Sequence, residues 1–283
     1  MHQYQLHQYH HQQDFLPSPA LTHPTIDDMM QCVDQHTGEW WALMDIMCTE
    51  SIDEIISDII KGTAVAVSDS SFKDERGTDA WIIENASGTQ RLLGKVLVPG
   101  YASDHSAYRS EIAGLYGIVL MVEIIKKVWR LTKGSILVGC DGKTTLEQAL
   151  QFRKNRTSSK QKHFDLLSGI QGYVRDSVIS YTPLHIKGHQ DRHTNLANLD
   201  WLAILNIEVD TYAKDFWTEK FSPSMDPRPY FHYHIPKGMW KVSFSNTRVV
   251  KHLSKYLRKS IEGGGKLHSI GLIRGTVLLL LIF

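Results

Sequence analysis

The sequence predicts an α/β fold in which helices flank a mixed five-stranded sheet. Three observations predict it: short apolar runs bounded by turn-forming residues, longer segments with apolar residues at helical spacing, and the order of the two patterns along the chain. Three strands come first, followed by a helix, a strand, two helices, a strand and a final helix. This order favours a sheet that has both parallel and antiparallel neighbours.

The expected strands are short apolar runs. They are predicted at residues 64–69, 81–83, 92–98, 136–140 and 178–187. Pro183 lies inside the fifth run and cannot donate a hydrogen bond to a neighbouring strand. The fifth strand is therefore expected at an edge of the sheet.

The expected helices carry apolar residues every three or four positions. In the longest, the apolar stripe comprises Tyr108, Ile112, Leu115, Val119, Val122 and Ile125. Three shorter helices are predicted at about 144–152, 163–175 and 198–217. Trp81 and Trp201 are interpreted as core residues rather than as platforms for stacking bases.

We divide the chain into three parts. Residues 1–60 are expected to comprise a disordered tail rich in His and Gln, then one or two short amphipathic helices between 25 and 60. Residues 61–217 form the predicted α/β domain. Residues 218–283 are expected to hold a proline-rich linker and a small extension, with a strand at 239–244 and a basic helix at 249–261.

Composition limits the classes of protein to consider. The chain has 283 residues, 42% of them hydrophobic and 22% charged, and a net charge of +1, which argues against coating nucleic acid by charge alone. Three cysteines without a CxxC pair suggest neither a zinc knuckle nor a disulfide framework. No secretory signal or membrane-spanning segment is predicted. We expect an intracellular monomer, in the cytoplasm or the nucleus.

Two aspartates follow buried strands. Asp69 ends the first predicted strand, and Asp141 comes directly after the fourth. A carboxylate next to a buried run is costly unless it is solvated, paired or bound to metal. Because open α/β sheets bind ligands at the carboxyl ends of their strands, these two acids are candidates for a site.

Two further acids lie on helices. Glu111 borders the apolar stripe of the long helix, although an ordinary helix-surface acid is an equally good interpretation of it. Asp210 follows Asn206 by one helical turn, with small residues on the same face. Four acids together suit phosphodiester hydrolysis, in which two Mg²⁺ ions roughly 4 Å apart stabilise the attacking and leaving oxygens. Mg²⁺ prefers oxygen ligands.

Four segments of the chain resemble the type 1 ribonuclease H family, in particular the RNase H domains attached to retroelement reverse transcriptases. They appear in the family's order and read VSDSSFKDERGTDAWII, RSEIAGLYGIV, VGCDG, and HIKGHQD followed by LNIEVDTYAK. The resemblance implies a ribonuclease H-like fold. It also implies an endoribonuclease that hydrolyses the RNA strand of RNA–DNA hybrids by a two-metal-ion mechanism, with a reverse transcriptase domain as a partner.

The resemblance also assigns roles to individual residues. The ligands of two Mg²⁺ ions, for which Mn²⁺ can substitute, would be Asp69, Glu111, Asp141 and Asp210. His189, in a loop, would assist proton transfer or product release. The predicted nucleic-acid-binding residues are Ser70 and Ser71, together with the basic segment Arg153, Lys154 and Arg156, for which a solvated loop is the alternative.

Several positions depart from the family's pattern. Ser70 stands where the family usually has Gly, and Gly142 where it usually has Ser or Thr. The stretch before Asp210 is long and offers Asp191 and Asp200 as rival fourth acids. Two other functions stay open: a non-catalytic nucleic-acid-binding module, and a DNA-directed nuclease or integrase with the same type of fold.

Overall fold

The computed structural model describes residues 23–36, 39–100, 104–151 and 161–221 with their side chains. It also describes the backbone of three C-terminal strands at 240–243, 266–273 and 276–282. The expected N-terminal tail up to residue 22, the basic segment and the basic helix at 249–261 lie outside the described residues.

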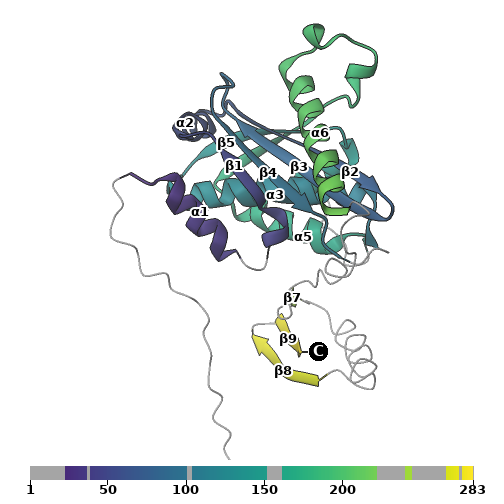
Figure 1. Cartoon of the computed structure of the whole chain (residues 1–283). Helices are drawn as coiled ribbons and strands as arrows, with labels where there is room; N and C mark the ends of the chain where they lie inside the picture. The colour runs from purple at the N-terminus through teal and green to yellow at the C-terminus, as the bar shows by residue number, and fades with distance from the viewer. Residues whose placement is uncertain are drawn as a thin grey trace, which may run out of the picture.

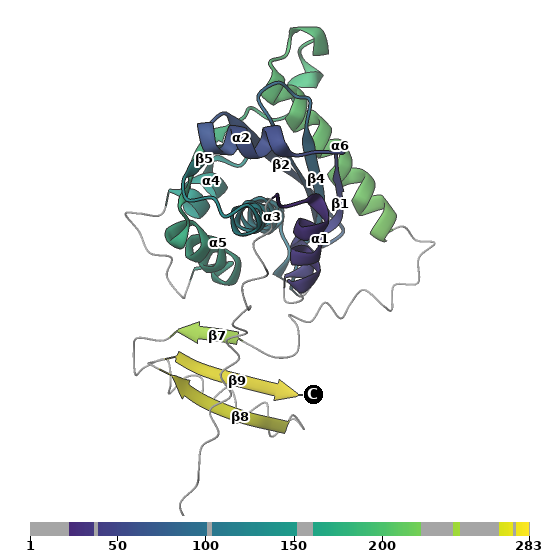
Figure 2. The same ribbon diagram turned by 90° about the vertical axis from the view of Figure 1, so that its left-hand side faces the viewer.

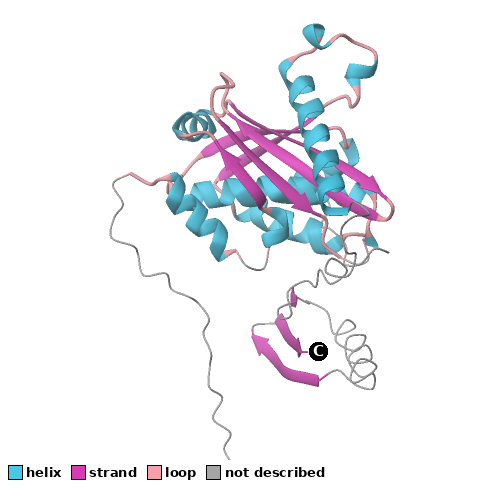
Figure 3. Ribbon diagram, in the orientation of Figure 1, coloured by secondary structure: helices cyan, strands magenta, loops and turns pink. Residues whose placement is uncertain are grey.

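A mixed sheet forms the centre of the fold (Figure 3). Its strands are β1 (Met44–Cys48), β2 (Ala64–Lys73), β3 (Arg76–Glu84), β4 (Arg91–Leu97), β5 (Gly134–Cys140) and β6 (Ile179–His185), in the order β1-β4-β3-β2-β5-β6. The pairs β1–β4, β4–β3 and β3–β2 are antiparallel, whereas β2–β5 and β5–β6 are parallel. The predicted mixed sheet is confirmed, but it has six strands instead of five.

In the described residues, six α-helices accompany the sheet. They are α1 (Ile26–Gln35), α2 (Asp53–Lys61), α3 (Ala107–Val128), α4 (Lys143–Leu150), α5 (Phe164–Asp176) and α6 (Trp201–Phe221). Helix α6 crosses one face of the sheet, and α1, α3 and α5 lie on the other (Figure 1). Viewed along α3, the sheet and helices α1, α2, α4 and α5 surround it, while α6 lies beyond the sheet (Figure 2). Helix α3 is apolar almost all round, which is typical of a buried helix.

Two apolar clusters form the core, one on each face of the sheet. Ala64 and Ala66 of β2 belong to the cluster on the α3 side, while Val65 and Val67 belong to the cluster on the α6 side. Side chains alternate between the faces along a strand, so Asp69 continues the α6 side. On β3 the same alternation places Trp81 on the α3 side.

The one or two short helices expected between residues 25 and 60 are confirmed, but a strand that was not expected lies between them. Helices α1 and α2 are present, but residues 44–48 form strand β1, which pairs with β4 through Met44 to Lys95 and Cys48 to Leu92. The reason is long-range pairing: a five-residue edge strand contains too little pattern of its own to identify it. The core also extends before the expected boundary at residue 61, since Met29 and Ile55 are fully buried.

The predictions about the sheet edge and about Trp81 are confirmed, whereas the prediction about Trp201 is wrong. Strand β6, which contains Pro183, lies at an edge of the sheet as predicted. Trp81 is fully buried, which confirms its interpretation as a core residue. Trp201 is 36% exposed, so its assignment to the core is wrong. Its indole nitrogen instead donates a hydrogen bond to Glu84 at 2.9 Å.

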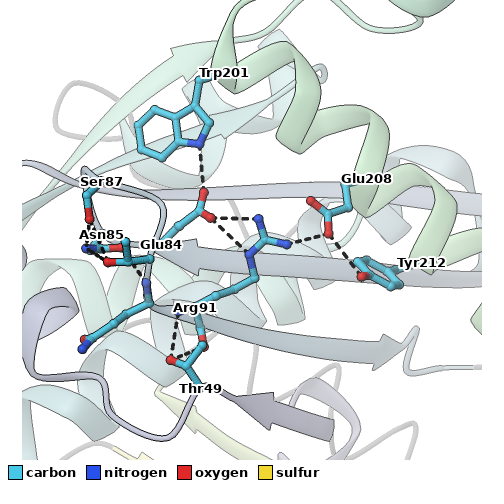
Figure 4. Close-up of polar contacts among 10 residues, drawn as sticks. Thr49, Glu84, Asn85, Ser87, Arg91, Trp201, Glu208 and Tyr212 are labelled. Atoms are coloured by element: carbon cyan, nitrogen blue, oxygen red, sulfur yellow. Dashed lines mark hydrogen bonds and ion pairs between the residues drawn. The ribbon is translucent and has the colours of Figure 1, made fainter. Parts of the chain in front are cut away.

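A polar network holds the first half of α6 on the sheet (Figure 4). Arg91 of β4 donates to Glu84 of β3 at 2.8 Å and to Glu208 of α6 at 2.5 Å. Tyr212 adds a hydrogen bond to Glu208 at 3.1 Å. Glu84 is almost fully buried, and the guanidinium of Arg91 balances the charge of its carboxylate. The network fixes the position of the helix that carries Asn206 and Asp210.

The C-terminal strands form a second, antiparallel sheet. It consists of β7 (Trp240–Ser243), β8 (Lys266–Ile273) and β9 (Thr276–Ile282) in the order β7-β9-β8. Strand β7 confirms the strand expected at 239–244. Among the residues that the structure describes, no helix has the length and apolar character needed to cross a membrane.

Candidate active site

Asp69 lies in the middle of the sheet, on the strand β2 that has neighbours on both sides. Its side chain is 6% exposed and accepts two hydrogen bonds, from the backbone N–H of Ser70 at 2.7 Å and from Nδ2 of Asn206 at 2.9 Å. Burial raises the pKa of Asp69 to about 8, and the nearby charge of Asp141 acts in the same direction. The hydrogen bonds from Ser70 and Asn206 oppose this shift only in part.

Asp141 and Asp210 bring two more carboxylates to Asp69. Asp141 follows β5, the parallel neighbour of β2, and Asp210 lies one turn after Asn206 on α6. Burial raises the pKa of Asp141, and the charge of Asp210 raises it further. The charge of Asp210 also acts on Asp69. Three acids from three different segments therefore repel one another beside the carboxyl end of β5. The prediction that Asp69 ends its own strand is wrong, because β2 continues to Lys73 in its hairpin with β3. Asp210 forms an ion pair with the half-exposed Lys214.

Glu111 approaches the same end of the sheet from α3. Burial raises its pKa, and Asp141 adds to the effect. The hydroxyl of Thr145 in α4 donates a hydrogen bond to Oε2 of Glu111. A Cβ atom at residue 142 would lie only 2.0 Å from that oxygen. The absence of a side chain at Gly142, where the family usually has Ser or Thr, thus makes room for Glu111.

A histidine-containing loop lies against Asp141. Nε2 of His185 is 2.9 Å from the backbone oxygen of Asp141. A Cβ atom at residue 188 would come within 2.7 Å of Oδ2 of Asp141, so the backbone at Gly188 directly borders that carboxylate. His189 follows with an exposed side chain and a φ of 53°, and its charge lowers the pKa of Asp141. The loop therefore brings an accessible imidazole close to the acids.

The rivals for the fourth acid lie elsewhere in the loop and helix. Asp200 accepts a hydrogen bond from the N–H of Ala203 at 2.8 Å, which caps the first turn of α6. Asp191 is exposed in a short 3-10 turn. Only Asp210 among the three interacts with both Asp69 and Asp141.

Of the predicted nucleic-acid-binding residues, only two are described. Ser70 and Ser71 are partly exposed on β2, directly after Asp69. The basic segment lies outside the described residues, and its role stays a prediction.

The sequence reasoning missed two residues of this region. Thr145, which is fully buried, donates to Glu111. Asp79 of β3 is also fully buried, and its charge interacts with Asp69, Glu111 and Asp141. One signal was present: Asp79 alternates with Trp81 and Ile83, so an acid stands on an otherwise apolar face of the strand.

The chemistry of the four acids fits a hard divalent cation. All their donors are oxygens, and mutual repulsion with burial raises the pKa of three of them, a cost that a bound cation would relieve. Their spacing is looser than a finished site: among the described residues, no three His, Cys, Asp or Glu side chains are close enough to hold a metal ion.

Comparison with known proteins gives similar folds and no match in sequence. No protein-family model and no curated protein matches the chain. Solved structures that are similar include the N-terminal RNase H domain of a Mycobacterium tuberculosis protein, with 15% identity and a TM-score of 0.31 over 56% of this chain and 96% of that one.

Two further similar structures carry the name RNase H1. An RNase H1 isolated from compost shares 11% identity, with a TM-score of 0.33 over 53% of this chain and 98% of its own, and was also solved with an RNA/DNA hybrid. RNase H1 from Halobacterium salinarum shares 10% identity, with a TM-score of 0.30 over 52% and 98% of the two chains. With TM-scores below 0.5 and identities of 15% or less, these structures carry no argument about function, which rests on this chain's own residues.

Proposed function

We propose that this chain is a metal-dependent endoribonuclease that hydrolyses the RNA strand of RNA–DNA hybrids. One observation carries the proposal: Asp69, Asp141 and Asp210, from two strands and a helix, interact electrostatically, with Glu111 beside Asp141. Mutual repulsion among buried acids destabilises the folded chain when no cation is bound, whereas bound cations would relieve that repulsion. Such an arrangement is typical of functional sites.

The four acids would hold two Mg²⁺ ions, or Mn²⁺ in their place. When bound, the ions stabilise charge on the attacking and leaving oxygens of the phosphodiester. Asp69 is the most firmly oriented acid, because Ser70 and Asn206 each donate to one of its oxygens. Thr145 orients Glu111 in the same manner. Asp210, whose one ion pair among the described residues is with the half-exposed Lys214, can exchange that partner for a cation.

His189 would handle the proton. Its exposed imidazole lies beside Asp141, close enough for their charges to interact. We assign it to moving a proton at the oxygen that leaves the phosphate, or to speeding release of the cleaved strand. Its position on a loop leaves room for it to withdraw when product departs.

The nucleic acid would approach along the exposed end of β2. Ser70 and Ser71 follow Asp69 there and offer hydroxyl and backbone groups to the RNA 2′-hydroxyl. The basic segment would contact phosphates. Hybrid specificity, retroelement origin and a reverse transcriptase partner rest on the resemblance of the sequence motifs.

A second function is favoured by one observation. The looser spacing of the acids in the described residues suits a non-catalytic module that binds nucleic acid without cutting it. The two functions differ in what a divalent cation does. If the chain is the enzyme, the cation is required for cleavage of the RNA strand. If the chain is the module, the nucleic acid stays uncleaved with or without the cation.

The test is cleavage by the full chain of three labelled substrates: an RNA–DNA hybrid, single-stranded RNA and double-stranded DNA. Each is incubated with Mg²⁺, with Mn²⁺ or with EDTA. The proposal predicts cleavage of the hybrid RNA strand alone, and only with a cation. Binding of the hybrid without cleavage would establish the non-catalytic module, and cleavage of DNA would establish a DNA-directed nuclease.

A further inference from the structure

Asp79 is a buried carboxylate without a partner. It lies on β3 opposite Ser70 of β2, and its side chain is 0% exposed. Neither of its oxygens accepts or donates a hydrogen bond within the described structure. Burying such a group in an apolar core without compensation is costly. Its presence therefore calls for a role beyond packing.

Glycine in the facing helix makes space for this carboxylate. A Cβ atom at residue 114 of α3 would lie 2.0 Å from Oδ1 of Asp79 and 2.2 Å from its Oδ2. Gly114 is also three residues after Glu111, which places it nearly one turn further along the same helix face. Glycine inside a helix costs about 1 kcal/mol relative to alanine. Strand β3 and helix α3 thus each carry a residue that is unfavourable at its position, and the missing side chain of Gly114 leaves room for the carboxylate of Asp79.

The charges that act on Asp79 are all negative. They come from Asp69 on β2, Glu111 on α3 and Asp141 after β5. In the part of the chain that the structure describes, no ion pair involves Asp79. Burial and these charges raise the pKa of Asp79 well above its usual value, so Asp79 keeps a proton in the cation-free chain. A positive charge among the neighbouring acids would favour loss of that proton and attract the carboxylate that remains. The side chain of Asp79 is fully buried, so solvent screens its field only weakly.

We propose that Asp79 is a fifth acid of the candidate site and increases its affinity for a divalent cation. This inference rests on the proposed function, since it assumes that the four acids bind the cation. Asp79 acts through its charge and through the positions of its neighbours. It contributes to binding without belonging to the ligand set assigned above.

The experiment measures cation binding without nucleic acid. Mn²⁺ is titrated calorimetrically into the full unaltered chain and into Asp79→Asn, which keeps the shape of the side chain and removes its charge. Asp79→Ala removes the charge by a second route, in case the amide disturbs folding. Asp74→Asn is the matched control, because Asp74 is exposed in the turn of the same hairpin and has a φ of 49°, which asparagine tolerates.

Loss of the unit charge that Asp79 carries when the cation is bound should raise the dissociation constant for Mn²⁺ on the order of tenfold in both Asp79 variants. The Asp74→Asn control should bind as the unaltered chain does. Folding is checked by circular dichroism, and the Asp79→Asn chain without cation should unfold at a higher urea concentration than the unaltered chain.

Equal Mn²⁺ affinities in folded Asp79→Asn or Asp79→Ala and the unaltered chain would overturn this inference and leave the proposed function standing. Normal cation binding that depends on Asp79, without any hybrid cleavage, would overturn the proposed function alone. If the unaltered chain shows no saturable Mn²⁺ binding, both are wrong.

Discussion

Replacing Asp69 by asparagine should make the cation-free protein more stable at pH 8 and flatten the dependence of its stability on pH. Burial and the charge of Asp141 raise the pKa of Asp69 to about 8. A carboxyl group whose pKa is raised by folding holds its proton more tightly in the folded chain than in the unfolded one. Its contribution to stability is complete below the unfolded pKa of about 4 and is lost as pH rises through about 8.

The magnitude follows from the shift. One proton bound only by the folded state changes the free energy of unfolding by at most about 1.4 kcal/mol per pH unit. Between pH 5 and pH 8 the upper limit is therefore about 4 kcal/mol. Asparagine does not ionise, and its side-chain oxygen still accepts from the N–H of Ser70. Its amide nitrogen would replace the oxygen that accepts from Nδ2 of Asn206, so the side-chain amide of Asn206 must turn over to present its Oδ1, a buried oxygen that has no partner in the described structure.

The assay is urea denaturation with EDTA present, followed by circular dichroism at several pH values from 5 to 8.5. The unaltered chain should lose stability as pH rises, and Asp69→Asn should lose less. Some dependence should remain, because the pKa values of Asp141 and Glu111 are also raised. Asp74→Asn should behave as the unaltered chain. Equal slopes for Asp69→Asn and the unaltered chain, or lower stability of the variant at pH 8, would refute the reasoning.

Three other predictions concern residues around the site. His189→Ala should lower the turnover of hybrid cleavage by about ten- to a hundredfold and leave hybrid affinity unchanged in binding titrations. Gly114→Ala should destabilise the chain by roughly 1–3 kcal/mol, because its methyl group would overlap the carboxylate of Asp79. Adding Asp79→Ala should remove that loss in urea denaturation. Replacing the basic segment by alanines should lower the log–log salt dependence of hybrid binding by roughly one unit per lost phosphate contact.

Each of these has its own control and contrary outcome. A weaker hybrid affinity with normal turnover would make His189 a binding residue. Gly172→Ala is the control for Gly114, because no atom lies within 4 Å of a Cβ placed there. Equal stability of the two glycine variants would show that the fit between Gly114 and Asp79 has no energetic effect. An unchanged salt slope would make the basic segment a solvated loop.

Local pattern predicted most of the central sheet, and long-range pairing explains what it missed. Five strands came from apolar runs, and the edge position of β6 followed from Pro183. Strand β1 was not predicted because it is short and half-exposed and is defined by its pairing with β4, more than forty residues away. Trp201 was misassigned because its partly exposed indole bonds to the buried Glu84, a contact that its own helix pattern does not contain.

The candidate site was predictable where an acid follows a strand. Asp69 and Asp141 were recognised in that way, and their interaction follows from the parallel pairing of β2 with β5. Glu111 needed the structure, because its direction depends on Thr145 and on the space at Gly142. Asp79 was not found, since its burial depends on helix α3 crossing β3 at a glycine. Which of these acids take part in catalysis stays a prediction.

The most direct test of the central claim is the rate of RNA-strand cleavage in a labelled hybrid by Asp141→Asn and by Asp191→Asn. Both changes replace an acid by its amide, but only Asp141 interacts with Asp69 and Glu111, whereas Asp191 is exposed in a neighbouring turn. We predict that the unaltered chain and Asp191→Asn cleave the hybrid with Mg²⁺ and not with EDTA, while folded Asp141→Asn is inactive. Cleavage by Asp141→Asn at more than about a tenth of the unaltered rate would contradict the assignment of these acids to a metal-dependent nuclease site.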